Sequence, residues 1–412
     1  MKKEFRDIVI IGAGPSGSIA AGYLEKQDAS VMILEKQKFP RFTIGESLIP
    51  KCMENFEEAG FLDALTSQGF QKKFGARFIK NNGSAEFDFS KKFSEGWSWT
   101  WQVPRADFDK VLTDELSSRG VDIRFETEVT SVSYYDKLWT IKTRNQKKGE
   151  EFEITSKFII DSSGNGRVLA RQLDLEAPPK IYDHSSIFTH IEETGRPEGV
   201  EGNLISFEVL NTETWFWYIP FSNGTSSLGF VGPNKWFDSF GHDNSLAFRK
   251  MLMKTDYYQG RFDKYEFQFE PVKINNISKN VKYVHGDGFA LTGNSAEFLD
   301  PVFSSGVAFA TESSLLAAKL AFREINGEKI DWEVEYSDYI KMGVNVFATY
   351  VKEWYSGKLQ DIFFHPYPNP QIKEQICAVL AGYVWDNKNP FVRNHARILE
   401  NLHKLIQKEK IA

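Results

Sequence analysis

Cysteine and excess positive charge are scarce in this chain. Its 412 residues include two cysteines, Cys52 and Cys377, which lie far apart in the sequence. We therefore expect unpaired thiols in a reducing cytoplasm and no disulfide framework. The net charge of -6 argues against a nucleic-acid partner, because such proteins usually carry a basic face.

Long apolar runs and metal-binding motifs are lacking as well. No apolar run reaches the roughly 18 residues that span a membrane, so we expect no transmembrane segment. The chain enters an apolar strand within its first residues, so we expect no signal peptide. The seven histidines form no HExxH arrangement, so we expect no catalytic metal. These absences favour a cytoplasmic protein.

Aromatic residues, by contrast, are abundant. They make up 15% of the chain, with 35 Phe and 10 Trp. Two interpretations are open: a bulky core, or a pocket that holds flat rings by stacking.

The segment 6–36 is the most informative part of the sequence. Asp7 to Ile11 is a short apolar run typical of a buried parallel strand. A GxGxxG pattern follows, formed by Gly12, Gly14 and Gly17. In this pattern the first glycine allows a tight turn, the second lets the backbone approach a pyrophosphate, and the third allows close packing of helix and strand.

The rest of this segment supports the same interpretation. A helix after the turn would aim its amino-terminal N–H groups at the pyrophosphate. Val31 to Leu34 reads as a second strand, and Glu35 follows at about the spacing expected for a carboxylate on ribose hydroxyls. The order predicts an adenine-dinucleotide site, and the alternative is a Rossmann-like unit without a nucleotide.

Further along, the patterns predict first α/β alternation, then short strands, then helices. Predicted helices cover 50–59, 105–119, 245–253 and 306–326. Predicted strands cover 70–78, 85–89, 121–132, 139–143, 158–160, 186–190, 204–209, 214–219, 227–231 and 289–292, with a small antiparallel sheet around 139–143. From residue 331 the tail is predicted to be mostly helical, with a proline-rich loop at FFHPYPNPQ.

These elements predict an α/β fold: a Rossmann-like dinucleotide-binding domain interleaved with a mixed or antiparallel β-sheet substrate domain, plus a mainly helical C-terminal segment. The discontinuous dinucleotide domain would comprise 1–75, 100–175 and 280–326. The sheet domain would comprise 76–99 and 176–279, and the helical region 327–412. Such an arrangement leaves a cleft between the two domains.

Four motifs resemble the flavoprotein monooxygenase fold, which includes aromatic hydroxylases, and most closely its flavin-dependent halogenase-like branch. The first is the glycine unit with FPRFTIGESLIP, and the second is Lys73-Phe74-Gly75-Ala76, similar to K-x-G-A. The third is WFWYIP at 215–220, a match to WxWxIP, and the fourth is GNSAEFLDPVFSSGV at 293–307. The resemblance covers about positions 6 to 310.

The resemblance implies FAD as the cofactor and names the residues around it. They are Gly12, Gly14, Pro15, Ser16, Gly17, Glu35, Lys36, Arg41, Glu46, Ser47, Arg105, Asp161, Gly293, Asn294, Asp300, Pro301, Gly306 and Val307. The family normally has Asp at the position of Asn294, and Asn keeps the hydrogen bond without the charge, which implies weaker FAD binding. For Asp161, a strand-end residue that caps a turn is the plain alternative.

For catalysis, the resemblance implies that Lys73 matches the lysine that passes the halogenating species to the substrate. The alternatives are a solvated strand lysine, since most lysines are exposed, or the neighbouring Lys72 in this role. The implied substrate wall comprises Trp215, Trp217, Ile219, Pro220, Phe303, Ser304 and Ser305. Packing between domains is the alternative for the tryptophans, and a helix N-cap is the alternative for the serines.

The implied function is that of an FAD-dependent oxidoreductase or monooxygenase, halogenase-like, that uses peroxyflavin chemistry on a small aromatic substrate. Phe303 stands where tryptophan halogenases carry glutamate, which favours a phenolic or pyrrolic substrate. No second GxGxxG precedes a helix, so the reductant would be transiently bound NAD(P)H or a flavin reductase. Two alternatives remain: a reductase of isoprenoid or polyene chains, resembling geranylgeranyl reductases, and a non-catalytic lipid-binding protein on this fold.

Overall fold

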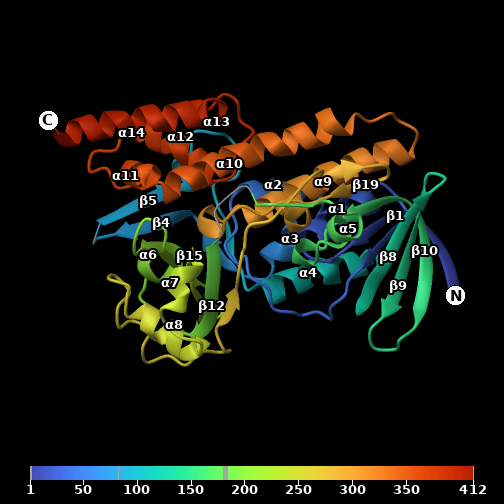
Figure 1. Cartoon of the computed structure of the whole chain (residues 1–412), viewed down its shortest axis with the longest axis horizontal. Coiled ribbons are helices and arrows are strands. Elements are labelled where there is room, and N and C mark those ends of the chain that lie inside the picture. Colours follow the sequence, from blue (N-terminus) through green and yellow to red (C-terminus); the bar gives the residue numbers. More distant parts are fainter. Residues whose placement is uncertain (1, 82, 180–183, 412) are drawn as a thin grey trace.

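The computed structural model describes residues 2–81, 83–179 and 184–411. Two β-sheets lie at opposite ends of the molecule, and the C-terminal helices run along one side of both (Figure 1). The predicted α/β fold with an interleaved sheet region and a helical tail is confirmed.

The first sheet has the strand order β18-β19-β10-β1-β2-β7. Its strands are β1 (Lys2–Ile11), β2 (Val31–Leu34), β7 (Asp122–Arg124), β10 (Glu151–Asp161), β18 (His285–Gly286) and β19 (Phe289–Leu291). The four pairings from β19 to β7 are parallel, and β18 is antiparallel to β19. The central strands are apolar runs because helices α1 (Pro15–Glu25) and α9 (Gly306–Ile325) pack against each other over one face.

The predicted small antiparallel sheet is in fact a hairpin attached to this parallel sheet. Strands β8 (Thr127–Tyr135) and β9 (Leu138–Asn145) pair with each other, and β9 pairs with β10. Strand β10 extends well beyond the predicted 158–160, because its first half pairs with β9 and its second half continues beside β1. The polar residues of that first half hid it from the sequence pattern.

The second sheet has the order β16-β12-β15-β14-β13-β4-β5. Its strands are β4 (Gly75–Lys80), β5 (Gly83–Asp88), β12 (His184–Glu192), β13 (Ser206–Val209), β14 (Trp215–Pro220), β15 (Thr225–Pro233) and β16 (Val272–Ile274). One pairing, β13 with β4, is parallel and the others are antiparallel. Alternate β14 residues serve two cores, because Phe216 and Tyr218 pack towards α8 (Asn244–Leu252) whereas Trp215 and Trp217 join the main core.

A small ladder and a loop connect the two sheets. Strands β3 (Gln71–Lys73) and β6 (Thr100–Gln102) pair antiparallel. The loop 35–50 contains a cis peptide bond before Pro40 and leads into α2 (Lys51–Glu58), and α4 (Arg105–Ser118) follows β6. The shorter elements are α3 (Leu62–Thr66), α5 (Val168–Gln172), α6 (Val200–Asn203), α7 (Asn234–Asp238), β11 (Glu176–Ala177) and β17 (Asn280–Val281).

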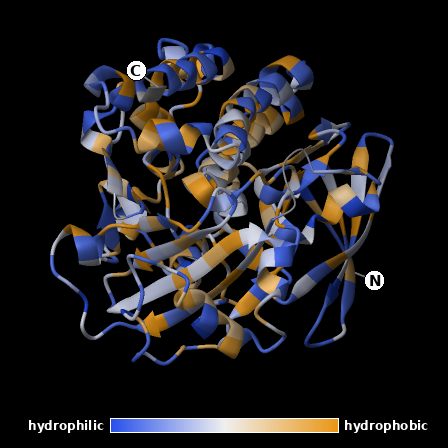
Figure 2. Cartoon of the chain, turned by 60° about the vertical axis from the view of Figure 1, so that its left-hand side comes forward, coloured by the Kyte–Doolittle hydropathy of each residue, from blue (hydrophilic) through white to orange (hydrophobic). Residues whose placement is uncertain are grey.

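The C-terminal helices are part of the main core. They are α10 (Tyr339–Tyr355), α11 (Lys358–Phe363), α12 (Pro370–Leu380), α13 (Pro390–Arg393) and α14 (His395–Ile411), and the predicted proline-rich loop lies between α11 and α12. Trp354 of α10 lies 5.4 Å from Phe78 of β4, centroid to centroid. Hydrophobic and hydrophilic residues are mixed around these helices (Figure 2). The exact domain bounds given above stay a prediction.

Candidate functional site

A cavity of about 700 Å³ extends from the glycine turn to the aromatic strand β14. This volume is within the usual range of ligand pockets, roughly 300–1,000 Å³. Segments far apart in the sequence line it: the turn after β1, the loop 35–47, the turn after β10, strand β14 and the loop before α9. The resemblance had implied this set of segments, and the cavity brings them to one place.

The three glycines of the GxGxxG turn have different surroundings. Gly12 has a φ of +101°, and a Cβ there would collide with the carbonyl of Ser162. A Cβ at Gly17 would collide with the Gly12 carbonyl oxygen. At Gly14, however, the nearest atom to such a Cβ is Nη2 of Arg41 at 3.5 Å, and Gly14 lines the cavity. Gly12 and Gly17 thus close the turn, whereas Gly14 leaves the space on the cavity side of the turn open.

Glu35 lies between the turn and the cavity. Its carboxylate accepts hydrogen bonds from the backbone N–H of Ala13 (2.9 Å) and of Gln37 (2.8 Å), and the residue is 6% exposed. Lys36 lines the same end and pairs with Glu128 at 2.7 Å. In the resting structure Glu35 therefore also stabilises the glycine turn.

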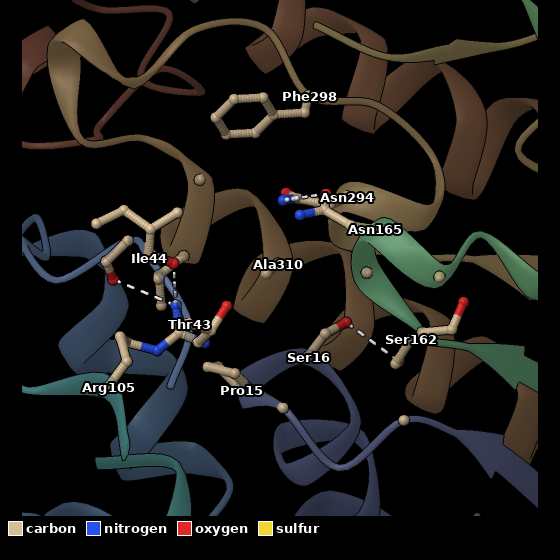
Figure 3. Close-up of a pocket in the computed structure, with 18 of the residues that line it drawn as sticks. Pro15, Ser16, Thr43, Ile44, Arg105, Ser162, Asn165, Asn294, Phe298 and Ala310 are labelled. Atoms are coloured by element: carbon tan, nitrogen blue, oxygen red, sulfur yellow. Dashed lines mark hydrogen bonds between the residues drawn. The ribbon is translucent and has the colours of Figure 1, made fainter. Parts of the chain in front are cut away.

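Three hydroxyl groups join α1 to the ends of two parallel strands. Ser16 Oγ lies 2.7 Å from Thr292 Oγ1 and donates to Ser162 Oγ at 3.1 Å, a bond drawn in Figure 3. All three residues line the cavity. Ser162 and Thr292 were not predicted as site residues; their positions at strand ends beside the turn were the signal available.

Two arginines of the cavity share one buried carboxylate. Arg105 donates to Asp109 through Nε (2.8 Å) and Nη2 (3.0 Å), and Arg41 Nη1 lies 3.0 Å from the same carboxylate. Arg105 also donates to the carbonyl of Ile44 at 3.0 Å. Since two cations face one anion, the cluster of Arg41, Arg105 and Asp109 carries a net positive charge. Sequence analysis missed Asp109, although it follows Arg105 by one helical turn.

Two asparagines lie on the opposite side of the pocket from Pro15 and Arg105 (Figure 3). Asn294 Nδ2 donates to Asn165 Oδ1 at 3.4 Å, and both residues line the cavity. Asn294 therefore faces the cavity, and its contact with the cofactor stays a prediction.

Asp161 and Gly293 lie behind the lining. Asp161 accepts from the backbone N–H of Ser163 (2.9 Å) and of Leu169 (2.7 Å), and burial raises the pKa of its carboxyl. This geometry is that of the alternative considered for Asp161, a residue that caps a strand-end turn. Gly293, at φ +54°, accepts no side chain because Ala310 lies close to where a Cβ would be.

The aromatic end of the cavity is formed by β14 and its neighbour β13. Trp215 and Trp217 lie on one face, 5.9 Å apart between ring centroids, and line the cavity with Ile219. Trp217 Nε1 donates to Ser227 Oγ at 3.1 Å. Pro220, at the end of the strand, is not in the lining. The alternation predicted for the two tryptophans places both at the cavity and in the main core.

The loop before α9 divides into residues that face the cavity and residues that hold the loop. Pro301, Ser304, Gly306 and Val307 line the cavity, whereas Asp300, Phe303 and Ser305 do not. Phe303 packs edge to face on Trp354, 5.8 Å between centroids.

Asp300 is a buried group that ties this loop to the aromatic strand. Its carboxylate accepts from Val302 N (2.9 Å) and from the Tyr355 hydroxyl (2.9 Å), which in turn accepts from Trp215 Nε1 at 2.9 Å. Burial raises the pKa of Asp300 to about 7. Tyr355 and His184, whose rings stack at 4.2 Å, were not predicted as site residues.

Lys73 is buried and Lys72 is not. Lys73 is 1% exposed; its Nζ donates to Ser47 Oγ (2.8 Å) and to the Leu48 carbonyl (2.7 Å), and burial lowers its pKa to about 7. Lys72 points to the other side of β3, where its Nζ lies 4.6 Å from the Trp99 ring centroid. Lys73 is not among the residues that line the cavity, whereas Ser47 is.

Glu46 is a buried acid at the cavity next to Ser47. Its Oε1 lies 2.8 Å from Nε2 of His190, the distance of an ion pair when the imidazole is protonated, and neither carboxylate oxygen has a hydrogen-bond partner in the described part of the chain. His190 was not foreseen from the sequence. His190 is not in the lining, whereas the lining residues that were not foreseen include Asn165, Ser186, Ile205, Phe207, Asn275 and Phe298.

Two further findings concern the described residues as a whole. None of the helices in 2–81, 83–179 and 184–411 is long and apolar enough to cross a membrane. Within the same ranges, no group of three or more His, Cys, Asp or Glu side chains is arranged to hold a metal ion.

The chain was compared with known proteins. The model of the FAD binding domain family matches residues 6–254. A solved structure described as a flavoprotein/dehydrogenase from Cytophaga hutchinsonii is 46% identical, with a TM-score of 0.96 over 99% of this chain and 100% of that one. A flavin-dependent brominase structure is 25% identical, with a TM-score of 0.84 over 98% of this chain and 100% of that one.

Among curated proteins, two similar relatives are halogenases. The 1H-pyrrole-2-carbonyl-[peptidyl-carrier protein] chlorinase of Pseudomonas fluorescens is 28% identical over 93% of this chain and 90% of its own length. The corresponding brominase of Pseudoalteromonas luteoviolacea is also 28% identical, over 93% of this chain and 94% of its own length.

Proposed function

Because the chain belongs to the FAD binding domain family and is a flavoprotein related to halogenases, we propose that it is a halogenase-like FAD-dependent monooxygenase. Its substrate would be a small phenolic or pyrrolic ring. The observation that carries the proposal is the single cavity, which joins a dinucleotide-type glycine turn to an aromatic strand. Ser47 lines this cavity, and its hydroxyl accepts a hydrogen bond from the buried Lys73.

The polar end of the cavity suits FAD. The open space at Gly14, the first turn of α1 and the two arginines on Asp109 would hold the pyrophosphate. Glu35 would hold the ribose, and the amides of Asn165 and Asn294 would hydrogen-bond the hydroxyl-bearing chain of the cofactor. FAD, once bound and reduced, would supply oxygen activation.

The aromatic end suits a flat substrate. Trp215, Trp217 and Phe207 offer ring faces, whereas Ile205 and Ile219 exclude water. Phe303 stands where the tryptophan halogenases carry a glutamate, so the loop offers no carboxylate there for an amino group. The pyrrole rings named in the two curated relatives are of the size and polarity that such a wall accepts.

Lys73 would supply the polar chemistry of the reaction. Its burial and its bonds to Ser47 and Leu48 hold the amine in one position. A pKa lowered by burial to about 7 lets the amine gain or lose a proton near neutral pH. The reductant would be a separate flavin reductase or transiently bound NAD(P)H.

A halogen-incorporation assay tests the proposal. The purified protein is incubated with FAD, a reductant, oxygen, bromide and a panel of phenols and pyrroles. The masses of the products are then measured by mass spectrometry. A gain of bromine that requires the protein and reduced FAD supports a halogenase, and a gain of one oxygen supports a hydroxylase. Reduced FAD that is reoxidised with neither product in any panel member contradicts the proposal.

A second candidate is an FAD-dependent dehydrogenase. The observation that favours it is the exclusion of Lys73 from the cavity lining, together with the 46% identity to a structure described as a flavoprotein/dehydrogenase. An anaerobic titration separates the two candidates. A dehydrogenase substrate bleaches the bound FAD without oxygen, whereas a monooxygenase substrate leaves its colour unchanged.

A further inference from the structure

The layer between the Lys73 amine and the cavity is the Ser47 hydroxyl, which Ser304 contacts. Its side chain is 1% exposed and does not line the cavity, whereas Ser47 and Ser304 both do. Lys73 Nζ lies 2.8 Å from Ser47 Oγ, and Ser304 Oγ lies 3.1 Å from the same Ser47 atom. Any chemical influence of the amine on a ligand in the cavity must therefore pass this layer.

Ser47 is the centre of these contacts. A lysine ammonium can only donate hydrogen bonds, so Ser47 Oγ accepts from Lys73, and it also accepts from Ser304. A hydroxyl has two acceptor positions and one hydrogen, so both acceptor positions of Ser47 are used. Its own hydrogen is left to point into the cavity, where a ligand oxygen can receive it.

The Ser304 contact depends on an unusual backbone. Ser304 has a φ of +57°, in the left-handed region that non-glycine residues seldom adopt. This conformation follows the turn Pro301–Phe303, which Asp300 holds by accepting from Val302 N at 2.9 Å. The loop is thereby fixed in the position that brings the Ser304 hydroxyl to Ser47.

We propose that the Ser47 hydroxyl carries protons between Lys73 and a ligand in the cavity, and that Ser304 orients it. The inference rests on the proposed function for the reaction it serves, but the route itself is a property of the resting protein. Ser47 is thus assigned as a catalytic residue, since its oxygen faces the ligand, and Ser304 as a positioning residue.

The proton transfer balances. As a ligand oxygen in the cavity gains negative charge, the Ser47 O–H bond breaks and that proton bonds to the ligand oxygen. At the same time one N–H bond of the Lys73 ammonium breaks, and its proton and Ser47 Oγ form the new hydroxyl. Lys73 is left as a neutral amine, and after the product leaves, a proton from an acid in bulk solvent (hydronium or buffer), passed through Ser47 in the opposite direction, recharges it.

The groups that face Lys73 leave its charge free to change. The titratable neighbour from α2 is Cys52, whose thiol stays neutral because burial raises its pKa to about 12. Other groups that contact the amine are uncharged: the Ser47 hydroxyl, the Leu48 carbonyl and the Phe89 ring, 5.5 Å from Nζ to the centroid. Burial lowers the pKa of Lys73 to about 7, so both protonation states are accessible near neutral pH.

Amine labelling tests the route without any substrate. The FAD-loaded protein is treated with formaldehyde and cyanoborohydride, and methylation of Lys72 and Lys73 is read by tandem mass spectrometry. Wild-type protein should label Lys72 at least tenfold faster than Lys73. In Ser47→Ala the layer opens, and the rate at Lys73 should approach that at Lys72. In Ser304→Ala, the matched control, Ser47 stays in place and Lys73 should remain protected.

Two labelling results would overturn the proposal. One is a wild-type Lys73 that labels as fast as Lys72, because the amine would then meet the cavity directly. The other is a Ser47→Ala variant in which Lys73 stays fully protected, because Ser47 would then not lie on the route. Either result decides the route even if the protein proves not to be a halogenase.

A pH profile of bromination tests the catalytic role. Ser47→Ala should keep its FAD and lose at least tenfold in rate, and the limb near pH 7 assigned to Lys73 should disappear. Ser47→Thr, which restores a hydroxyl, should recover the rate and that limb. A Ser47→Ala variant with the wild-type rate and profile contradicts the role. Wild-type protein that brominates nothing contradicts the proposed function and leaves the labelling result to decide the route.

Discussion

The two ends of the cavity are built in different ways. At the polar end, main-chain atoms form most of the cavity surface. Gly12, Gly14, Gly17 and the first turn of α1 together form a backbone cradle. At the aromatic end side chains from distant segments define the surface, and Trp215 is held by Tyr355, which lies 140 residues later. A backbone cradle tolerates changes in many side chains, whereas a wall of interlocked side chains changes with each member.

The largest effect should come from closing the backbone cradle. Gly14→Val should abolish FAD binding, a loss of at least about hundredfold or roughly 2.7 kcal/mol, because the new side chain would occupy the phosphate space. The fold should survive, since Gly14 has an extended backbone and an ordinary contact distance to Arg41. Flavin absorbance of the purified protein measures the outcome.

Gly83→Val, at the exposed first position of β5 and away from the cavity, is the matched control and should keep the yellow colour. A Gly14→Val protein that retains FAD would show that the cradle is not where the cofactor binds.

The next effect concerns the reactive amine near the other end. Lys73→Met should keep FAD and lose bromination by about 10² to 10⁴-fold, the usual contribution of a positioned acid–base group. Lys72→Met should keep the rate, because Lys72 lies on the outer side of β3 over Trp99. Initial rates with reduced FAD and bromide measure both variants. Equal losses of rate in the two variants would contradict a specific role of the Lys73 amine and would indicate that both substitutions act by disturbing strand β3.

The pH dependence of stability should also carry the signature of Lys73. Burial lowers its pKa from 10.5 to about 7, so between these values the unfolded chain binds more protons than the folded one. The free energy of unfolding then rises with pH across this window, since the cost of the buried ammonium is full below pH 7 and fades towards pH 10.5.

Comparison with Lys73→Met isolates this contribution. Between pH 7.5 and 9.5 the free energy of unfolding of the wild type should rise, relative to that of the variant, by up to about 1.4 kcal/mol per pH unit. Urea unfolding of both proteins at several pH values measures the difference. Parallel curves would mean that the amine titrates in the folded protein as it does in water.

The smallest effect should come from a single hydroxyl behind the aromatic wall. Tyr355→Phe removes the bonds to Trp215 and Asp300 and should cost about 1–3 kcal/mol of stability, because both buried partners lose a contact. Tyr350→Phe on the same helix loses one long bond to the Phe391 carbonyl (3.4 Å) and should cost less. Equal unfolding midpoints for the two variants would contradict the special position of Tyr355.

The sequence was most informative where neighbouring residues specify the structure. The succession of strand, glycine turn, helix and strand around Gly12 and the bounds of β2 follow from local pattern and turn chemistry. The shared face of Trp215 and Trp217 follows from strand alternation.

Tertiary contacts explain what the sequence could not show. Two adjacent lysines on a three-residue strand carry no sign of which one is buried, and the packing of β3 against α2 and the loop at Ser47 decides it. The turn-capping bonds of Asp161 also follow from the path of the chain after β10. Tyr355 could not be recognised because its partners come from two remote segments.

The hydrogen bond between Tyr355 of α10 and Trp215 affects how the substrate preference of such a protein can change. Since Tyr355 touches the wall from behind, substitutions in the C-terminal helices can tilt an indole ring without altering any residue that meets the ligand. A search for variants that accept a different aromatic substrate should therefore randomise residues of α10 as well as residues of β14.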